Sequence, residues 1–242
     1  MSSTESLPPV CILAGGLGKR LGTVVDEVPK PLIEVAGEPF LVHQLRLLAA
    51  NGVDRVALCV GYRGEQIEAR LGPECCGIEI SYSYDSPELD GTLGAIRRAA
   101  DSLEARFLVL YGDAFLRMDY RAAVAAWTRS GLPAMMAVLH NENRWDTSNA
   151  TFDGTRVTAH DKHAPSADMH WIDYGLGGLD RVTLATVGPE ERDLAVLYSE
   201  LARRGELFGY EATERFYEIG SPASLAETDA FLRTELRAQG PL

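Results

Sequence analysis

Long hydrophobic runs are missing from this 242-residue chain. No stretch approaches the roughly 20 apolar residues that a membrane-spanning helix needs. The N-terminal segment "MSSTESLPP" contains no lysine or arginine and no long apolar run, which argues against a signal peptide. We therefore expect residues 1–8 to be a flexible lead-in, the protein to be cytoplasmic and a membrane not to be its partner.

Positive charge is also scarce. The chain has 23 lysines and arginines against 35 aspartates and glutamates, for a formal net charge of −12. Because phosphate backbones attract basic surfaces, this balance argues against nucleic acid as a partner. Against so acidic a background, a small cluster of cations stands out as a candidate anion site.

Cysteine and histidine are few, with four and five residues. Cys11 and Cys59 lie in apolar, strand-like runs, where we expect them to be buried. Cys75 and Cys76 precede a glycine in a predicted turn. The cysteines have neither the spacing of a zinc site nor that of a disulfide framework. The histidines are scattered and lack the usual neighbouring ligands, so they do not favour a metal site.

Neither internal repeats nor low-complexity linkers interrupt the chain. Apolar strand patterns alternate with amphipathic helix patterns as far as residue 140, which is typical of an α/β protein with a doubly wound, mostly parallel sheet. The pattern predicts strands over 9–15, 55–61, 77–84, 106–113 and 133–140, and helices over 39–52, 64–72, 92–103 and 120–131.

Residues 145–180 break this alternation. The segment "SNATFDGTRVTAHDK" predicts a hairpin that turns at Asp153-Gly154, and we interpret the region as a small set of added strands over one end of the sheet. A helix over 190–204 and a strand over 207–212 follow. The last helix is expected to start at Pro222, with Ser221 as its cap. Residues 9–237 are of a length that fits a single domain.

The glycine-rich segment "LAGGLGKRLG" follows the first predicted strand. In an open α/β sheet this position lies at the carboxyl edge, where ligands bind, and glycines allow backbone N–H groups to approach phosphate oxygens closely. The segment is not a P-loop, which reads GxxxxGK followed by serine or threonine. Here Gly18-Lys19 is followed by Arg20, and Leu13 stands where the first glycine would be.

The dinucleotide fingerprint GxGxxG is also incomplete. Gly16-Leu17-Gly18 begins it, but Leu21 stands where the third glycine belongs, and the next glycine is Gly22. The fingerprint further needs an acidic residue at the end of the second strand. That strand ends "CVGYRG", with no acid.

With "VPKP" added, the same segment closely resembles the signature of nucleotidyltransferases that join a nucleoside triphosphate to a sugar 1-phosphate. Their signature reads G-G-x-G-[TS]-R, a spacer and then P-K-P. In this signature Lys19 replaces the usual threonine or serine. Further segments resemble later family motifs in the same order: "LDGTLGAIRRA" (89–99), "FLVLYGDAF" (107–115), "AHDK" (159–162), "WIDYGLGGLDR" (171–181) and "FYEIGSP" (216–222). In two of these later motifs, Leu93 of segment 89–99 replaces a glycine and Glu218 of segment 216–222 replaces a more usual aspartate.

This resemblance covers nearly the whole chain and is strongest to the heptose-1-phosphate and mannose-1-phosphate guanylyltransferase branch. It implies a Rossmann-like nucleotidyltransferase domain over residues 9–237. It also implies a Mg²⁺-dependent reaction in which a nucleoside triphosphate and a sugar 1-phosphate give a nucleoside diphosphate sugar and pyrophosphate. The branch favours GTP and a heptose or hexose 1-phosphate, with the base read by loop backbone near residues 84–92.

The resemblance also assigns residues to roles. Catalytic roles fall on Arg20, Lys30 and Asp113. Nucleotide contacts are expected from Leu13, Ala14, Gly15, Gly16, Gly18, Lys19, Gly91 and Thr92. Sugar-phosphate contacts are expected from Asn149, Asp161, Lys162, Asp173 and Gly175, and Mg²⁺ ligation from Asp113 and Glu218.

Two other readings stay open at this point. One is a non-catalytic regulator that binds a nucleotide or sugar phosphate on the same fold, to which the substitutions Lys19, Leu93 and Glu218 draw attention. The other is an NAD(P)-dependent oxidoreductase, which the broken fingerprint argues against. Oligomeric state, including a homo-oligomer, is not readable from the pattern.

Overall fold

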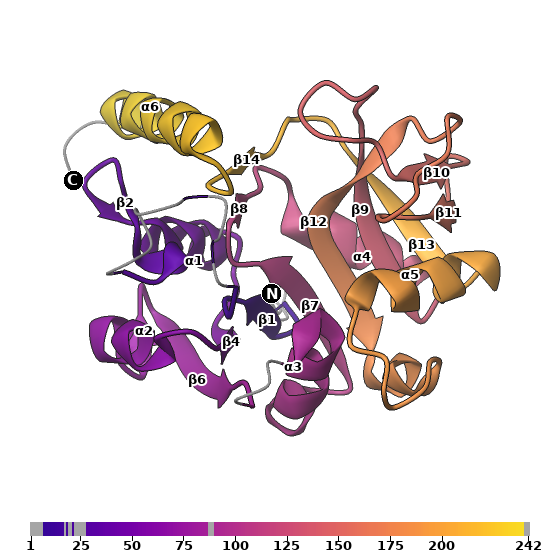
Figure 1. Cartoon of the computed structure of the whole chain (residues 1–242), viewed down its shortest axis with the longest axis horizontal. Helices are drawn as coiled ribbons and strands as arrows, with labels where there is room; N and C mark the ends of the chain where they lie inside the picture. Colours follow the sequence, from indigo (N-terminus) through magenta and orange to yellow (C-terminus); the bar gives the residue numbers. More distant parts are fainter. Residues whose placement is uncertain (1–6, 17, 19–20, 22–27, 87–89, 240–242) are drawn as a thin grey trace, which may run out of the picture.

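The structure, a computed structural model, describes residues 7–16, 18, 21, 28–86 and 90–239. Within this part of the chain, ten strands form a central sheet (Figure 1). Its first half is parallel, in the order β6-β4-β1-β7. These strands are β1 (Val10–Leu13), β4 (Arg55–Val60), β6 (Ile78–Tyr84) and β7 (Arg106–Tyr111). The prediction of a doubly wound, mostly parallel sheet is confirmed.

The second half of the sheet is mixed. Its strands are β9 (Ala134–His140), β10 (Ala150–Phe152), β11 (Val157–His160), β12 (Trp171–Asp180) and β13 (Leu207–Ala212). The β10–β11 hairpin turns at Asp153-Gly154 as predicted and lies at the edge of the sheet. The interpretation of the whole 145–180 region as strands added over one end is wrong in one respect. Strand β12 lies in the middle of the sheet, antiparallel to both β7 and β9.

The glycines of β12 explain why this strand can lie in the middle of the sheet, and why its residue pattern does not predict a central strand. A Cβ atom on Gly177 would lie 1.8 Å from Oη of Tyr198, and one on Gly178 would lie 2.6 Å from the ring of Trp127. Tyr198 and Trp127 belong to helices, so the bare glycine backbone lets large aromatic side chains pack directly on this strand. Glycine is depleted in ordinary strands, which hides a central strand from a pattern based on apolar residues.

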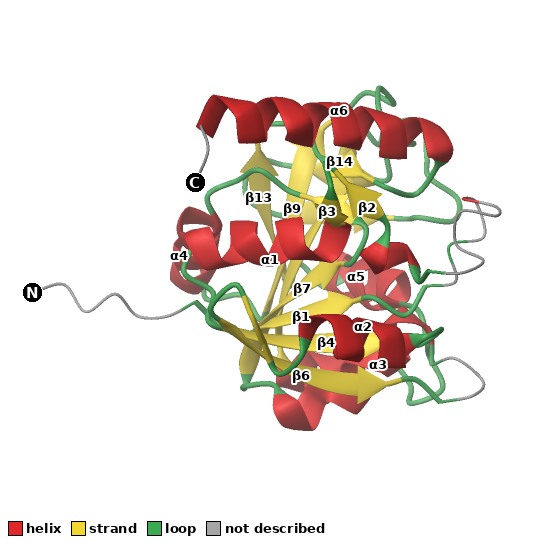
Figure 2. Ribbon diagram, turned by 90° about the vertical axis from the view of Figure 1, so that its left-hand side faces the viewer, coloured by secondary structure: helices red, strands yellow, loops and turns green. Residues whose placement is uncertain are grey.

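Helices cover both faces of the sheet (Figure 2). The residues of β1 alternate between two buried clusters, because successive side chains of a strand point to opposite faces. One cluster includes apolar side chains of three helices, α1 (Phe40–Ala50), α2 (Gly64–Leu71) and α4 (Tyr120–Ser130). The other includes α3 (Gly91–Ala99) and α5 (Leu194–Arg203).

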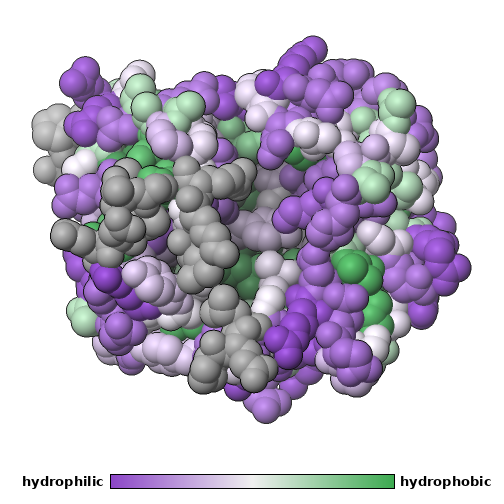
Figure 3. Space-filling view, in the orientation of Figure 1, coloured by the Kyte–Doolittle hydropathy of each residue, from purple (hydrophilic) through white to green (hydrophobic). Residues whose placement is uncertain are grey.

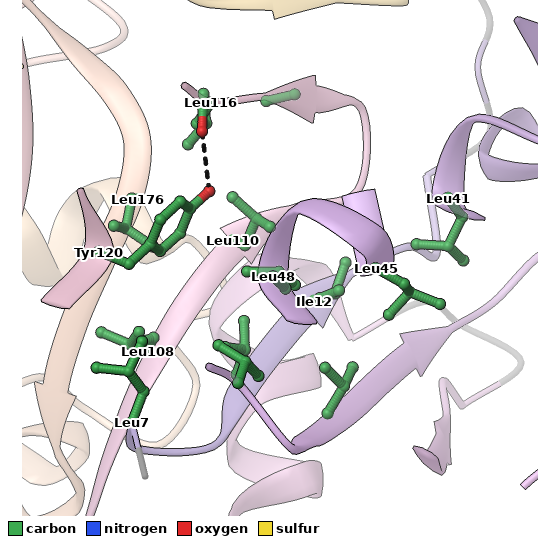
Figure 4. Close-up of a cluster of buried hydrophobic side chains, with 14 of the residues drawn as sticks. Leu7, Ile12, Leu41, Leu45, Leu48, Leu108, Leu110, Leu116, Tyr120 and Leu176 are labelled. Carbon is green, nitrogen blue, oxygen red and sulfur yellow. Dashed lines mark hydrogen bonds between the residues drawn. The ribbon is translucent and has the colours of Figure 1, made fainter. Parts of the chain in front are cut away.

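Figure 4 shows part of the first cluster. Leu45 and Leu48 of α1 share this cluster with Ile12 of β1 and with Leu108 and Leu110 of β7. The Tyr120 hydroxyl donates to the Leu116 carbonyl over 3.2 Å. Leu7 is buried in the same cluster, although it falls in the predicted lead-in; residues 1–6 lie outside the described part. Cys11 and Cys59 are buried free thiols on adjacent strands, as expected, with their sulfurs 3.4 Å apart.

The C-terminal segment crosses back to the first half of the molecule. Strand β14 (Tyr217–Glu218) pairs antiparallel with β8 (Ala114–Phe115), and α6 (Pro222–Gln239) follows. The Ser221 hydroxyl accepts from the Ser224 N–H over 3.1 Å, which confirms the predicted cap. None of the helices in the described ranges is long and apolar enough to cross a membrane. The short elements are β2 (Glu34–Val35), β3 (Glu38–Pro39), β5 (Glu74–Cys75), η2 (Lys30–Leu32), η3 (Ala100–Ser102) and η4 (Arg181–Ala185).

Candidate active site

A pocket opens where β1 and β7 end, at the carboxyl edge of the parallel strands. Ligands bind at this edge in open α/β sheets. Figure 3 shows this face of the molecule hollowed near its centre. The pocket is lined by Leu13, Ala14, Gly15, Gly16, Gly18, Lys30, Pro31, Cys59, Asp85, Gly91, Thr92, Ala95, Tyr111, Gly112, Asp113 and Lys162.

The glycine loop is held at the sheet by its neighbours. The Ala14 N–H donates to the Cys59 carbonyl over 2.8 Å. A Cβ on Gly15 would lie 2.9 Å from Oδ2 of Asp85 and 3.1 Å from the Gly61 nitrogen, so a larger residue would not fit there without a shift. Gly15, Gly16 and Gly18 therefore present bare backbone to the pocket. The predicted residues Lys19 and Arg20 lie outside the described part of the chain.

Lys30 and Asp113 meet at the pocket wall. Lys30 begins η2, and Pro29 before it has φ −62° and ψ 143°, the extended conformation that proline favours. The Lys30 Nζ donates to Oδ2 of Asp113 over 2.6 Å. The Lys30 side chain is only 11% exposed and that of Asp113 is 33% exposed. The geometry thus joins two predicted catalytic residues in one ion pair.

Gly91 and Thr92 enter the pocket at the start of α3. A Cβ on Gly91 would lie 2.6 Å from the Arg192 carbonyl oxygen, and the Gly91 φ of +69° also favours glycine. The Thr92 hydroxyl accepts from the Leu194 N–H over 2.9 Å, which ties α3 to α5. Leu93, the departure from the family pattern, is fully buried in the core between these helices. Its side chain therefore does not obstruct the pocket.

Among the five residues expected to hold the sugar phosphate, Lys162 lines the pocket. Its Nζ lies 5.4 Å from the centre of the Tyr111 ring, within the range of a cation–π contact. Asp161 accepts at Oδ1 from the backbone N–H groups of His163 and Ala164, so its carboxylate closes a local turn.

The three remaining sugar-phosphate candidates form a chain of hydrogen bonds beside the pocket rather than part of its lining. The Asp173 N–H donates to Oδ1 of Asn149 over 2.8 Å, and the Gly175 N–H donates to Oδ1 of Asp173 over 2.9 Å. Asp173 and Gly175 lie at the register shift of β12, and Asn149 directly precedes β10. Burial raises the pKa of Asp173. A sugar contact by these residues stays a prediction.

The pairing of β8 with β14 places the backbone of Glu218 beside that of Asp113, although Glu218 is not among the residues that line the pocket. Glu218 pairs with Ala114, the residue after Asp113, and the Ile219 N–H donates to the Asp113 carbonyl over 3.0 Å. Oε2 of Glu218 accepts from the Gly220 N–H over 2.7 Å. Carboxylate oxygens are the ligands that Mg²⁺ prefers, usually one or two from protein with phosphates and waters completing the set. The described residues hold no group of three or more metal-binding side chains, and Mg²⁺ ligation by Asp113 and Glu218 stays a prediction.

Sequence reasoning missed several lining residues, of which Asp85 and Tyr111 are the largest. Asp85 directly follows β6, the third parallel strand, whereas the search for an acid was confined to the end of the second. Tyr111 is the last residue of β7. Burial raises the pKa of its phenol well above the usual value. A systematic look at the residue after every parallel strand would have found Asp85.

Comparisons with known proteins agree with this geometry. The pattern of the family described as nucleotidyl transferase matches residues 10–148. D-glycero-alpha-D-manno-heptose 1-phosphate guanylyltransferase of Aneurinibacillus thermoaerophilus is 41% identical over 111 residues, which cover 46% of this chain and 48% of that protein. Mannose-1-phosphate guanylyltransferase catalytic subunit beta of Drosophila melanogaster is 28% identical over 222 residues, 87% of this chain and 59% of that one. The matches span about half the length of these relatives.

Solved structures share the fold. HddC from Yersinia pseudotuberculosis, in complex with GMP-PN, superimposes with a TM-score of 0.78 at 22% identity, over 93% of this chain and 100% of that chain. The inositol-1-phosphate CTP transferase from T. maritima gives a TM-score of 0.71 at 19% identity, over 93% and 96%. The family pattern covers more than half of the residues here, and its glycine loop, Lys30 and Asp113 line one pocket. The chain therefore belongs to the nucleotidyl transferase family.

Proposed function

We propose that this chain transfers a nucleotidyl group from a nucleoside triphosphate to a sugar 1-phosphate and releases pyrophosphate. The observation that carries the proposal is a single pocket lined by the glycine loop, the Lys30–Asp113 ion pair and Lys162. The two guanylyltransferase relatives favour GTP with a heptose or hexose 1-phosphate as the substrates.

The composition of the cations supports the same proposal. The chain has only three lysines, Lys19, Lys30 and Lys162, and its remaining 20 cationic side chains are arginines. All three lysines fall in the predicted site. A lysine ammonium is a compact point charge, whereas the arginine guanidinium is a planar fork, so the two are not interchangeable at a phosphate.

In the proposed reaction the protein supplies position and charge. Backbone amides of Gly15, Gly16 and Gly18 hold the β- and γ-phosphates, and Lys30 stabilises negative charge that grows on the α-phosphoryl group. Lys162 binds the sugar phosphate, whose oxygen attacks the α-phosphorus as pyrophosphate leaves. Because both substrates are held in one pocket, their reaction becomes effectively unimolecular. The reaction needs no nucleophile from the protein.

We further propose that the reaction depends on Mg²⁺ held by Asp113 and Glu218. When bound, the ion would offset charge on the phosphate oxygens. The Lys30 ammonium orients the Asp113 carboxylate through their 2.6 Å hydrogen bond, and the Gly220 N–H does the same for Glu218.

The test is a matrix of four nucleoside triphosphates against several sugar 1-phosphates, with pyrophosphate release as the readout and Mg²⁺ or EDTA present. We expect steady release with GTP and one heptose or hexose 1-phosphate, and none with EDTA. Binding of nucleotide without pyrophosphate from any pair would instead favour the non-catalytic binding protein.

The three lysines allow a matched second measurement. An amine-reactive label read by mass spectrometry should modify Lys30 and Lys162 less when GTP and sugar 1-phosphate are present. The α-amino group serves as the internal control whose labelling stays unchanged. Equal labelling of both lysines with and without substrates would contradict their placement at the phosphates.

A further inference from the structure

One polar side chain of helix α1 is buried among leucines. Gln44 is only 2% exposed, and Leu41, Leu45 and Leu48 of the same helix are buried in the first cluster (Figure 4). Burying an amide costs free energy unless it is hydrogen-bonded. The hydrogen bonds of Gln44 must therefore offset the cost of placing it in the core.

The Gln44 amide joins the two ends of the turn that carries Asp113. Its Nε2 donates to the Ala114 carbonyl over 2.6 Å and to the Tyr111 carbonyl over 3.0 Å. Gly112 and Asp113 lie between these two residues, in the turn from β7 to β8. The amide nitrogen carries two hydrogens, so it can serve both carbonyls, whereas the amide oxygen only accepts and would repel them.

Backbone groups hold the middle of the same turn. The Gly112 N–H donates to the Leu13 carbonyl over 3.0 Å, and the Asp113 carbonyl accepts from the Ile219 N–H over 3.0 Å. A Cβ on Gly112 would lie 2.8 Å from the Leu13 carbonyl oxygen, so the turn lies close against β1. Helix α1 is thus a third element that fixes the turn, besides β1 and the segment after β14.

The oxygen of the Gln44 amide indicates a role beyond filling space. Oε1 is buried and has no hydrogen-bond partner among the residues that the structure describes. An unpartnered buried acceptor costs free energy, and a methionine would fill a similar space without that cost. A methionine would, however, leave the two carbonyls without their donor.

Helix α1 is also tied to the segment of Lys30. The Phe40 N–H, at the start of α1, donates over 2.9 Å to the carbonyl of Ile33, the residue that ends η2. Lys30 begins η2, and its Nζ lies 2.6 Å from Oδ2 of Asp113. One helix therefore connects to the backbone segments of both members of the ion pair.

We propose that Gln44 is a positioning residue, which fixes the Gly112–Asp113 turn and thereby directs the Asp113 carboxylate toward Lys30 and the pocket. This inference rests on the proposed function of Asp113. Gln44 itself does not line the pocket, so it acts through the backbone of the turn and not on a substrate.

Gln44→Met tests the proposal, because methionine is also long and unbranched but donates no hydrogen bond. We expect kcat for pyrophosphate release to fall about 10- to 100-fold, since a displacement of about 1 Å can cost two powers of ten in rate. The KM for the nucleoside triphosphate should stay near its wild-type value, because the glycine loop is untouched.

Leu48→Ala is the matched control. Leu48 is fully buried on the same helix, so its truncation destabilises the core by leaving a cavity, without removing a donor from the turn. At a temperature where urea unfolding shows both variants to be folded, Leu48→Ala should keep the wild-type kcat. An equal loss of kcat in the two variants, or a wild-type kcat in Gln44→Met, would overturn the proposal.

The ion pair gives a second readout that needs no turnover. When the Asp113 turn is no longer fixed, an amine-reactive reagent should label Lys30 about two- to fivefold faster, the equivalent of one partly exposed ion pair. Labelling of Lys162 and of the α-amino group should not change, nor should that of Lys30 in Leu48→Ala. Unchanged labelling of Lys30 in Gln44→Met would overturn the proposal.

The inference and the proposed function can fail separately. If the wild type releases no pyrophosphate from any substrate pair, the proposed function fails, and the labelling of Lys30 still decides whether Gln44 fixes the turn. If Gln44→Met does not fold, Gln44→Asn replaces it, since it keeps the amide but is one methylene shorter. It should lower kcat and speed the labelling of Lys30, and wild-type values for both would contradict the role of Gln44.

Discussion

Replacing Lys30 with alanine is expected to abolish most turnover while leaving the fold intact. In the structure the Lys30 ammonium lies 2.6 Å from Oδ2 of Asp113 in a side chain that is 11% exposed, so it is a preorganised charge in a partly dry pocket. Removal of one such contact typically costs about 3–4 kcal/mol of transition-state stabilisation, or about two to three powers of ten in rate.

The cost to folding should be much smaller. Asp113 loses its cation, but its side chain is 33% exposed and water can replace the ammonium, so we expect a change of about 1 kcal/mol in the free energy of unfolding. Initial rates of pyrophosphate release at saturating substrates measure the first effect, and urea unfolding measures the second.

Lys30→Arg is the informative companion variant. It keeps the positive charge but replaces a point charge with a planar fork, so activity should recover only in part. A Lys30→Ala protein within about threefold of the wild-type rate would refute the role of Lys30. A loss of stability large enough to leave it unfolded at the assay temperature would refute the separation of catalysis from folding.

Four further variants test the metal pair, the buried histidine and the central strand. Asp113→Asn keeps the shape of the side chain but removes its negative charge, so turnover should fall about 100-fold or more at every Mg²⁺ concentration. A normal rate for this variant would contradict the role of Asp113. Glu218→Asp should retain or raise activity. Burial lowers the pKa of His160 below its usual 6.5, so the unfolded chain binds the proton more tightly and stability is lost as the pH falls below about 6.5. In urea unfolding, His160→Gln should lose less stability than the wild type between about pH 7 and pH 5. Equal losses would contradict His160 as the group whose protonation destabilises the fold. Gly177→Ala should destabilise the fold by about 1–3 kcal/mol, because its Cβ would lie 1.8 Å from Oη of Tyr198, and an unchanged unfolding midpoint would show that the tyrosine moves freely.

Local patterns predict much of this fold because they depend on residues close together in the chain. The strand expected over 207–212 is β13, and the last helix begins at Pro222 behind its Ser221 cap. Hydrophobic periodicity and capping residues act within a few positions, so they are readable directly. The central position of β12 was not readable, because its glycines are explained only by aromatic side chains from helices far away in the sequence.

The candidate site divides in the same way. The order of its motifs and the restriction of lysine to Lys19, Lys30 and Lys162 are properties of the sequence alone. The sequence also shows that Leu93 and Glu218 depart from the family pattern. It does not show that Leu93 fills the core or that Glu218 pairs with Ala114 of β8, the residue after Asp113.

Only the tertiary structure decided which groups face one another. Lys30, at the start of η2, meets Asp113, which follows the end of β7. Asp85 lies against Gly15 and Gly61 because β6, β4 and β1 pair side by side in that order. This order depends on contacts between residues far apart in the chain, whose energies come from burial and packing rather than from local propensity. The sequence by itself therefore determined the family, the order of the elements and most of the pocket residues. The tertiary structure determined which of these residues line one pocket and that Asp113 is paired with Lys30.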